Sequence, residues 1–209
     1  MSKHPINDTL LNGDLVREPV GDEQGYWAGA PGWVWDDTDQ AGYICYRIRR
    51  PRGVEPDRGG ESRIAKTTDF KTFEDIWSVH KDAYESASIE KSTLRRGADG
   101  RFRYFTSYVA PEDGRWCTTV NTADTVGDLD PTNTQRLFNA SDLGLEGVKD
   151  PWILEENGRY SMFLSVAILT ATTRASSHDS LDLFNTGECV SATALATSDA
   201  LDEWEWQGI

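Results

Sequence analysis

Hydrophobic and polar positions follow a pattern along this chain that recurs about every 60 residues, three times. Each block opens with a short apolar run, continues through a polar turn into an aromatic segment, and closes on a Thr/Ser/Ala–Asp pair. The apolar runs are Gly32-Trp33-Val34-Trp35, Ser92-Thr93-Leu94 and Trp152-Ile153-Leu154. The aromatic segments are Tyr43-Ile44-Cys45-Tyr46, Phe102-Arg103-Tyr104-Phe105 and Tyr160-Ser161-Met162-Phe163, and the closing pairs are Thr68-Asp69, Ala123-Asp124 and Ser198-Asp199.

A repeat of this kind predicts the architecture, because each unit has to bury its faces against its neighbours. Short alternating runs separated by Asp and Gly turns are typical of antiparallel strands. We therefore predict an all-β fold, a β-propeller of four-stranded antiparallel blades. An N-terminal arm covers residues 1–28, and a partial propeller covers 29–209, with blades at about 29–80, 85–140 and 146–209.

About three blades are fewer than the four or more that close a propeller. An open arc leaves sheet faces exposed, which predicts either further blades from elsewhere or self-association.

The candidate chemistry lies at the entry to each innermost strand, where side chains are expected to point into the mouth of the channel. Ala30, Glu90 and Asp150 occupy equivalent positions there, 60 residues apart. Pro151 is expected to hold Asp150 in an extended conformation. Asp150 and Glu90 are the candidate catalytic residues, since a carboxylate can bind a sugar hydroxyl or transfer a proton. The alternatives are a turn-capping Asp150 and a solvated Glu90.

Further candidates for substrate binding surround this rim. Arg47, Arg49 and Arg50 form a basic cluster, and grouped guanidinium groups bind carboxylates, phosphates or polyols. The alternative is that they pair with nearby acidic residues. Trp33 and Trp152 are candidates because indole rings stack on sugars, with core packing as the alternative. Glu85 is a weaker candidate. Two long loops, Arg49 to Gly60 and about Ala167 to Glu188, are expected on the same propeller face.

Composition narrows the class of protein. The net charge is −14, from 35 acidic and 21 basic residues, and 15 of the basic residues are Arg. This charge argues against nucleic-acid binding, which needs a basic surface. It suits either an ordinary acidic protein or one adapted to a high-salt cytoplasm. No stretch resembles a signal peptide or a membrane span, which predicts a cytoplasmic protein without a membrane partner.

The cysteines predict neither a disulfide framework nor a metal site. The chain has an odd number of cysteines, Cys45, Cys117 and Cys189, and no two of them have the Cys-x-x-Cys spacing. We expect buried free thiols. No cofactor or metal is expected.

The Lys149-Asp150-Pro151 corner, the hairpin from Asp99 to Phe105 and the strand end from Ala196 to Asp199 resemble the five-bladed propeller glycoside hydrolases of families 43 and 32, and more distantly the family 130 phosphorylases. The resemblance covers about residues 28–209. It implies that Asp150 corresponds to the third-blade Asp, which orients substrate and tunes the acid. The first-blade base position is Ala30 here, and the acid of the family is expected beyond the end of this chain.

The resemblance implies a glycoside hydrolase-like protein that hydrolyses or binds an oligosaccharide in the propeller funnel. Because Ala30 cannot act as a base, a non-catalytic carbohydrate-binding propeller is an alternative. A phosphorylase that uses the arginine cluster to bind phosphate is another.

Overall fold

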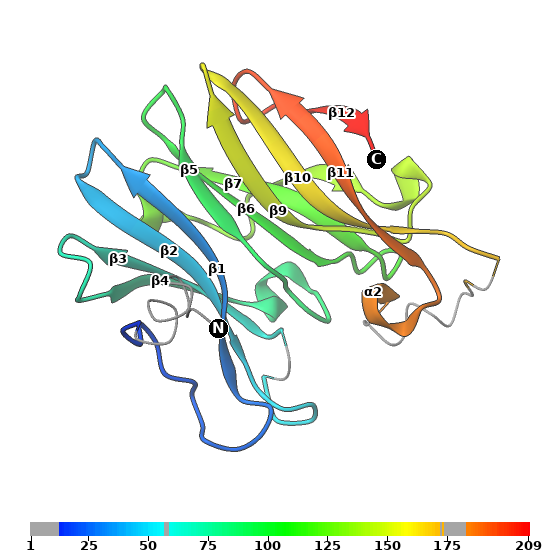
Figure 1. Ribbon diagram of the computed structural model, residues 1–209, viewed down its shortest axis with the longest axis horizontal. Coiled ribbons are helices and arrows are strands. Elements are labelled where there is room, and N and C mark those ends of the chain that lie inside the picture. Colours follow the sequence, from blue (N-terminus) through cyan, green and yellow to red (C-terminus); the bar gives the residue numbers. More distant parts are fainter. Residues whose placement is uncertain (1–12, 57–58, 172, 174–182) are drawn as a thin grey trace, which may run out of the picture.

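Within the residues that the structure describes, twelve strands form three consecutive antiparallel blades (Figure 1). The computed structural model describes residues 13–56, 59–171, 173 and 183–209. Residues 1–12 of the predicted arm lie outside the described residues, as do residues 172 and 174–182 of the second long loop. The prediction of an all-β, partial propeller with about three four-stranded blades is confirmed. Within the described residues, no helix is long and apolar enough to cross a membrane.

Each blade is a meander in which the strands follow one another from the inside outward. The first blade contains β1 (Trp27–Asp36), β2 (Ala41–Arg49), β3 (Glu61–Thr67) and β4 (Glu74–His80). The second contains β5 (Thr93–Arg96), β6 (Phe102–Val109), β7 (Trp116–Ala123) and β8 (Thr134–Asn139). The third contains β9 (Gly147–Glu156), β10 (Arg159–Ile168), β11 (Val190–Ser198) and β12 (Glu205–Gly208).

Short helical turns connect some of the strands. They are the 3-10 turns η1 (Lys81–Tyr84), η2 (Val126–Asp128) and η3 (Ser141–Leu143), and the single turn α2 (Leu183–Thr186). One parallel pair, Trp116 with Gly147, joins the second and third blades into one sheet.

The turns follow from local sequence. Asn157 and Gly158 link β9 to β10 with φ values of 53° and 76°, the positive values that a two-residue hairpin turn requires. The turn after the third strand recurs in two blades. The hydroxyl of Thr67 accepts a hydrogen bond from the Phe70 amide (2.9 Å), and that of Ser198 accepts one from the Leu201 amide (3.0 Å). Both Phe70 and Leu201 have positive φ, so the two turns are equivalent.

Two apolar layers hold the three blades together. We call the side of a blade that packs on the following blade its forward face and the opposite side its rear face. The forward face of the first blade (Tyr43, Cys45, Ile64) packs on the rear face of the second (Leu94, Phe102, Tyr104). The forward face of the second (Phe105, Val120, Phe138) packs on the rear face of the third (Ile153, Met162, Leu164). Neighbouring blades pack face to face, and each interface buries a mixture of aromatic and aliphatic side chains.

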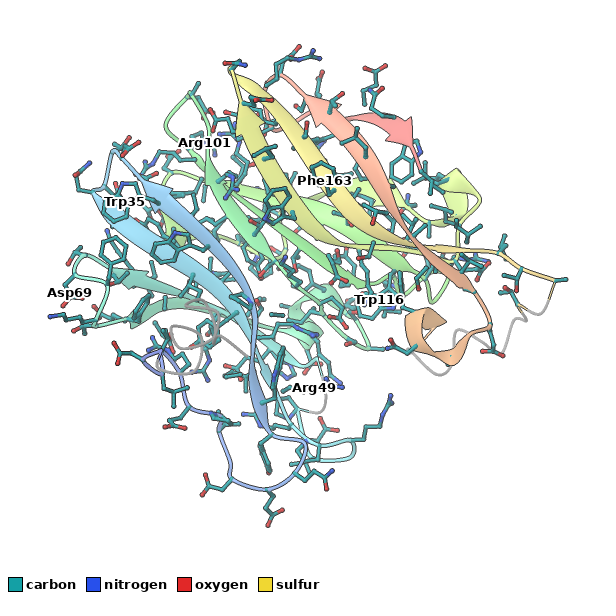
Figure 2. The ribbon with its side chains drawn as sticks, viewed as in Figure 1. Trp35, Arg49, Asp69, Arg101, Trp116 and Phe163 are labelled. Carbon is teal, nitrogen blue, oxygen red and sulfur yellow. The ribbon has the colours of Figure 1, made fainter. Side chains whose placement is uncertain are left out.

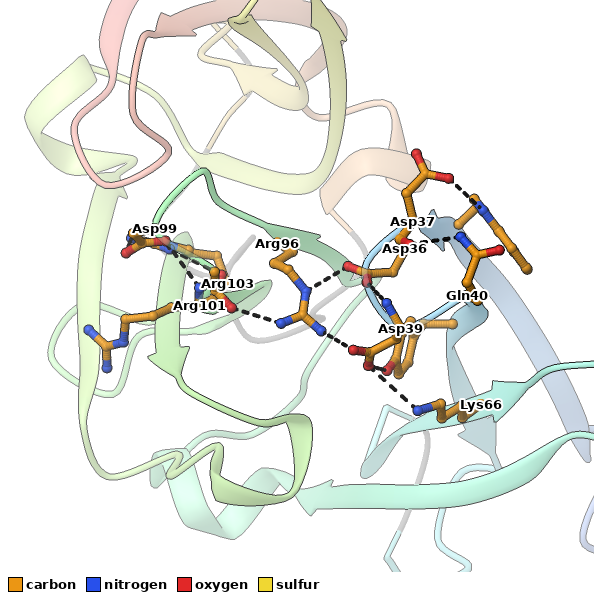
Figure 3. A network of polar contacts seen from close by, with 12 residues as sticks. Asp36, Asp37, Asp39, Gln40, Lys66, Arg96, Asp99, Arg101 and Arg103 are labelled. Atoms are coloured by element: carbon orange, nitrogen blue, oxygen red, sulfur yellow. Dashed lines mark hydrogen bonds and ion pairs between the residues drawn. The ribbon is translucent and has the colours of Figure 1, made fainter.

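Ion pairs link the same blades at the edge that carries the β1–β2 and β5–β6 hairpins (Figure 3). Arg96, at the end of β5, binds Asp36 (2.8 Å) and Asp39 (2.6 Å) of the first blade. Arg103 of the second blade binds Asp99 in its own hairpin and Asp202 of the third blade, the latter at 2.7 Å. One arginine therefore links each pair of neighbouring blades.

Candidate active site

A bulge at the entry of each innermost strand creates the candidate site. The pairing between β1 and β2 shifts by one residue between Gly29 and Gly32, and that between β9 and β10 shifts at the same place. Ala30 and Asp150 lie in these bulges with φ of 53° and 59°. In the second blade, pairing runs from Ile89–Tyr108 to Thr93–Phe105, so the corner that holds Glu90 contains one more residue on each strand.

The expectation that Asp150 is extended was wrong. The bulge turns the chain out of line with the strand, and this requires the left-handed region, in which Asp is among the better tolerated residues. The same conformation at Ala30, a residue that gains nothing from it, shows that the fold imposes it.

Ser107 on β6 holds the two acidic corners in place. Its carbonyl oxygen accepts a hydrogen bond from the Glu90 amide (2.8 Å). Its hydroxyl accepts one from the Asp150 amide (3.2 Å) and lies 3.2 Å from the Thr118 hydroxyl. Ser107 is completely buried, so one side chain of the second blade fixes the backbone at the entry of the third.

Alternating charges connect the rims of the three blades. Arg47 of the first blade binds Glu90 of the second at 2.7 Å and donates a hydrogen bond to the Ile89 carbonyl at 3.0 Å. The Lys149 ammonium lies 3.6 Å from Glu90 and 3.5 Å from Asp150. We call Arg47, Glu90, Lys149 and Asp150 the rim cluster. It places two predicted catalytic residues and one predicted arginine in a single network.

Aromatic rings around the rim cluster hold its two cations, Lys149 and Arg47, in position. The Lys149 ammonium lies 4.5 Å from the centre of the Phe184 ring and 5.2 Å from that of Trp116. Arg47 lies over Trp27, 5.8 Å from the ring centre. Cation–π contacts of this kind fix the positions of charged groups that would otherwise be mobile.

Two hollows adjoin the rim cluster. One, of about 430 Å³, lies beside Asp150 and is lined by Lys149, Asp150, Ser165, Phe184, Asn185, Ser191, Ala192 and Thr193. The other, of about 440 Å³, is lined by Gly25, Tyr26, Trp27, Arg49, Arg50, Pro51 and Arg52. The first presents one carboxylate, several hydroxyl groups and one aromatic ring, which are groups that bind polyols. The second contains two of the predicted arginines, of which Arg50 also lies 3.5 Å from Glu61.

Three predicted site residues lie outside both the rim cluster and the two hollows. Trp33 packs against Phe70, with ring centres 5.9 Å apart, and Trp152 packs against Phe163 at 5.6 Å. These two tryptophans lie on the faces of the outer blades. Glu85 follows η1 and is exposed, and among the described residues no hydrogen bond or ion pair joins it to the rim cluster.

Two residues that position the site carry little sequence signal. Ser107 lies in an aromatic strand and is an ordinary strand residue by pattern. Lys149 belongs to the Lys-Asp-Pro corner, but only the fold places its ammonium between two carboxylates on different blades. The spacing of 60 residues identified the corners, while their contacts depend on how the blades pack.

The prediction of buried free thiols is confirmed. Cys45, Cys117 and Cys189 are all buried and unpaired by disulfides. Burial raises the pKa of Cys45 and of Cys117 to about 12, which keeps both thiols protonated and unreactive. The part of the chain that the structure describes holds no group of three or more metal-ligating side chains.

The described fold also occurs in solved structures of larger enzymes. The chain superimposes with a TM-score of 0.58 on a GH43_12 protein from the capybara gut metagenome, at 14% identity, covering 91% of this chain and 32% of that one. A GH43_1 enzyme from Xanthomonas citri gives 0.54 at 11% identity, covering 90% and 57%. A GH43 β-1,3-galactosidase gives 0.51 at 14% identity, covering 92% and 61%.

The chain shares its fold with the β-propeller glycoside hydrolases of family 43. The resemblance expected from the sequence is therefore confirmed at the level of the fold. This propeller arc spans between 32 and 61% of the length of those three enzymes. A scan of protein-family models finds no match to the sequence, and a search of the curated proteins finds none either.

Proposed function

We propose that this propeller arc binds an oligosaccharide in the hollow beside Asp150. One observation carries the proposal. Asp150 lies at the mouth of a hollow of about 430 Å³ and has only the Lys149 ammonium, at 3.5 Å, as an ionic partner among the described residues. Its second oxygen and the hydroxyl groups of Ser165, Ser191 and Thr193 are placed to bind sugar hydroxyls. The neighbouring Phe184 offers a ring for stacking.

The corresponding corners of the other two blades provide no carboxylate that is as available to a ligand as Asp150. Ala30 has the same backbone conformation as Asp150 but no carboxylate. Glu90 has a carboxylate, but Arg47 binds it at 2.7 Å and Lys149 lies at 3.6 Å. Both cations already bind this carboxylate, which suits Glu90 to positioning Lys149. This arrangement favours binding as the activity of this chain.

Titration calorimetry with neutral oligosaccharides tests the proposal. Xylotriose is a suitable first probe, because a GH43_1 enzyme of the same fold was solved in complex with it. We expect Asp150→Asn, which tolerates the same backbone conformation, to weaken binding about tenfold through loss of one charged hydrogen-bond acceptor. Asp124→Asn, on an exposed turn, is the matched control and should bind normally. Equal affinity of Asp150→Asn and the unaltered protein would contradict the proposed site.

Hydrolysis is a second candidate function, favoured by the convergence of Glu90 and Asp150 on Lys149. Glycoside hydrolysis requires two carboxyl groups roughly 5–10 Å apart on either side of the bond. Release of p-nitrophenol from xyloside, arabinoside and galactoside substrates would measure it. Turnover that disappears in both Glu90→Gln and Asp150→Asn would favour hydrolysis. Binding without turnover would leave the chain as a carbohydrate-binding propeller arc.

A further inference from the structure

The hollow at the entry of the first blade has a different chemistry from the one beside Asp150. It has a volume of about 440 Å³ and lies between the arm and the end of β2. Among the described residues its lining contains three arginines, two aromatic rings and no acidic side chain; these five side chains are Arg49, Arg50, Arg52, Tyr26 and Trp27. We call it the arginine hollow. Its size falls within the roughly 300–1,000 Å³ of pockets that hold small ligands.

The concentration of positive charge at this hollow contrasts with the rest of the chain. The net charge is −14, yet four of the 15 arginines lie within residues 47–52. Arg47 binds Glu90 at 2.7 Å in the rim cluster, and the other three line the hollow. A negatively charged ligand is repelled by most of an acidic surface and attracted to a local cluster of cations.

The ion-pair network around Arg50 has more cations than anions. Nη1 of Arg50 is buried, lies 3.5 Å from Glu61 and forms no hydrogen bond within the part of the chain that the structure describes. Glu61 also binds Arg63, at 2.6 Å, and Asp75 is shared by Arg63 and Arg17. Three guanidinium groups therefore share two carboxylates. The network has one positive charge in excess, and Arg50 retains the capacity to bind a further anion.

The indole ring of Trp27 is fixed beside these arginines. Trp27 pairs with Arg49 across β1 and β2, and Gly29 pairs with Arg47. Because residues two apart in a strand share a face, Trp27 and Arg49 lie on the side of the blade that carries Arg47 and turns toward the second blade. A Cβ at Gly29 would lie 2.5 Å from the Trp27 ring, so glycine allows the ring to lie close to the strand.

The arm and the loop after β2 close the hollow from the other side. Gly25 has a φ of 102°, and a Cβ there would lie 3.1 Å from the Pro51 ring. Pro51 begins a turn in which its carbonyl oxygen accepts a hydrogen bond from the Val54 amide (3.1 Å). Arg52 lies in this turn. The backbone on both sides of the arginine hollow is therefore held in place by contacts within the chain.

We propose that the arginine hollow binds the carboxylate of an acidic sugar, such as a uronic acid unit. Guanidinium groups bind carboxylates through paired hydrogen bonds, and an indole ring stacks on the C–H face of a sugar ring. Inorganic phosphate would use the arginines but not the rings, and for this reason we favour a sugar acid. The two hollows have no described lining residue in common, so this site does not depend on oligosaccharide binding beside Asp150.

NMR titration of isotope-labelled protein tests the proposal, because it measures weak binding. Glucuronate and glucose differ only in the group at C6, and we expect glucuronate to bind at least about tenfold more tightly. Acetate supplies a carboxylate without a sugar ring and should bind at least about tenfold more weakly than glucuronate. Glucuronate binding should weaken as potassium chloride is raised from about 0.05 to 0.5 M, since salt screens the charges.

Substitutions in the lining identify the groups that bind. We expect Arg49→Met and Arg50→Met each to weaken glucuronate binding about tenfold. Arg50→Lys keeps the charge but loses the planar pair of donors, so its affinity should lie between those of Arg50→Met and the unaltered protein. Trp27→Leu should weaken the binding of glucuronate but not that of acetate.

Arg101→Met is the matched control, because it also removes one cation from the chain. Arg101 forms an exposed ion pair with Asp124, and Figure 2 shows it at the opposite end of the blades from Arg49. We expect this variant to bind glucuronate normally. Circular dichroism confirms that each variant is folded.

Three results would overturn the proposal. They are equal affinities for glucuronate and glucose, tighter binding of inorganic phosphate than of glucuronate, and unchanged glucuronate binding in both Arg50→Met and Arg50→Lys. Xylotriose titrated into the same samples reports on the hollow beside Asp150. A failure of oligosaccharide binding there is therefore seen separately from a failure of the arginine hollow.

Discussion

The backbone of Ala30 adopts a conformation that is unfavourable for alanine. Its φ of 53° lies in the left-handed region, where a Cβ costs roughly 1–2 kcal/mol and glycine costs little. The bulge that imposes this conformation also holds Asp150, where the carboxylate has a proposed use. At Ala30 the same backbone strain persists without a functional group.

We therefore expect Ala30→Gly to stabilise the protein by about 1 kcal/mol. The unfolding midpoint in urea measures the change. Ala28→Gly is the matched control, because Ala28 lies in β1 without a positive φ and packs against the core. That substitution should destabilise the protein by roughly 0.5–1 kcal/mol. A loss of stability in both variants would show that the bulge does not impose the strain described.

At the scale of elements, single arginines connect neighbouring blades. The contribution of each arginine to the free energy of unfolding depends on how deeply its ion pair is buried. Arg96 binds Asp36, which is buried, and Asp39, and its guanidinium lies 4.0 Å from the centre of the Phe102 ring. Removing the cation leaves the buried Asp36 carboxylate without its ionic partner. We expect Arg96→Met to lower the free energy of unfolding by roughly 3 kcal/mol.

The matched control is Arg101→Met in the same part of the second blade. Arg101 binds Asp124 at 2.9 Å, but both side chains are exposed. An exposed pair of this kind contributes less than about 1 kcal/mol. Equal effects of the two substitutions on the urea midpoint would show that burial does not decide the strength of these links.

Arg103, which links the second and third blades, also binds Asp99 in its own hairpin, and this pair predicts a dependence of stability on pH. Hydrogen bonds from Arg103 lower the pKa of Asp99 from 3.8 to about 2. Because the pKa is lower in the folded state, the stabilisation is complete above pH 4 and is lost as the pH falls toward 2. We expect Asp99→Asn to be less stable than the unaltered protein at pH 7 and to lose less stability between pH 4 and 2. Thermal unfolding at several pH values measures this, with Asp124→Asn as the control for charge.

At the scale of the whole molecule, the excess of acidic residues should make stability depend on salt. A net charge of −14 on 209 residues repels itself, and the Debye length falls from about 10 Å at 0.1 M to about 3 Å at 1 M salt. We propose that the protein is adapted to a salt-rich cytoplasm. The melting temperature should rise as potassium chloride is increased from about 0.1 to 1 M. A falling melting temperature would indicate that screening of the ion pairs outweighs screening of the repulsion.

The sequence by itself determined the repeat, and through it the fold class and the three corners. The spacing of Ala30, Glu90 and Asp150 is a property of the chain. Ala30 and Asp150 occupy equivalent bulges, while the corner that holds Glu90 is one residue longer on each strand. The sequence also predicted buried free cysteines, because Cys45 lies in an apolar strand. These features depend on local pattern, which a sequence displays directly.

Only the tertiary structure decided which side chains meet. The left-handed conformation of Asp150 arises from a bulge, although Pro151 alone favours an extended residue. Ser107 and Lys149 acquire their roles because neighbouring blades bring distant strands together. Trp33 and Trp152 were expected at the rim, but the pleat directs them to the outer blade faces. Contacts between blades depend on which face of a strand each side chain occupies and on the register of strand pairing. The sequence pattern does not specify either of these for each residue.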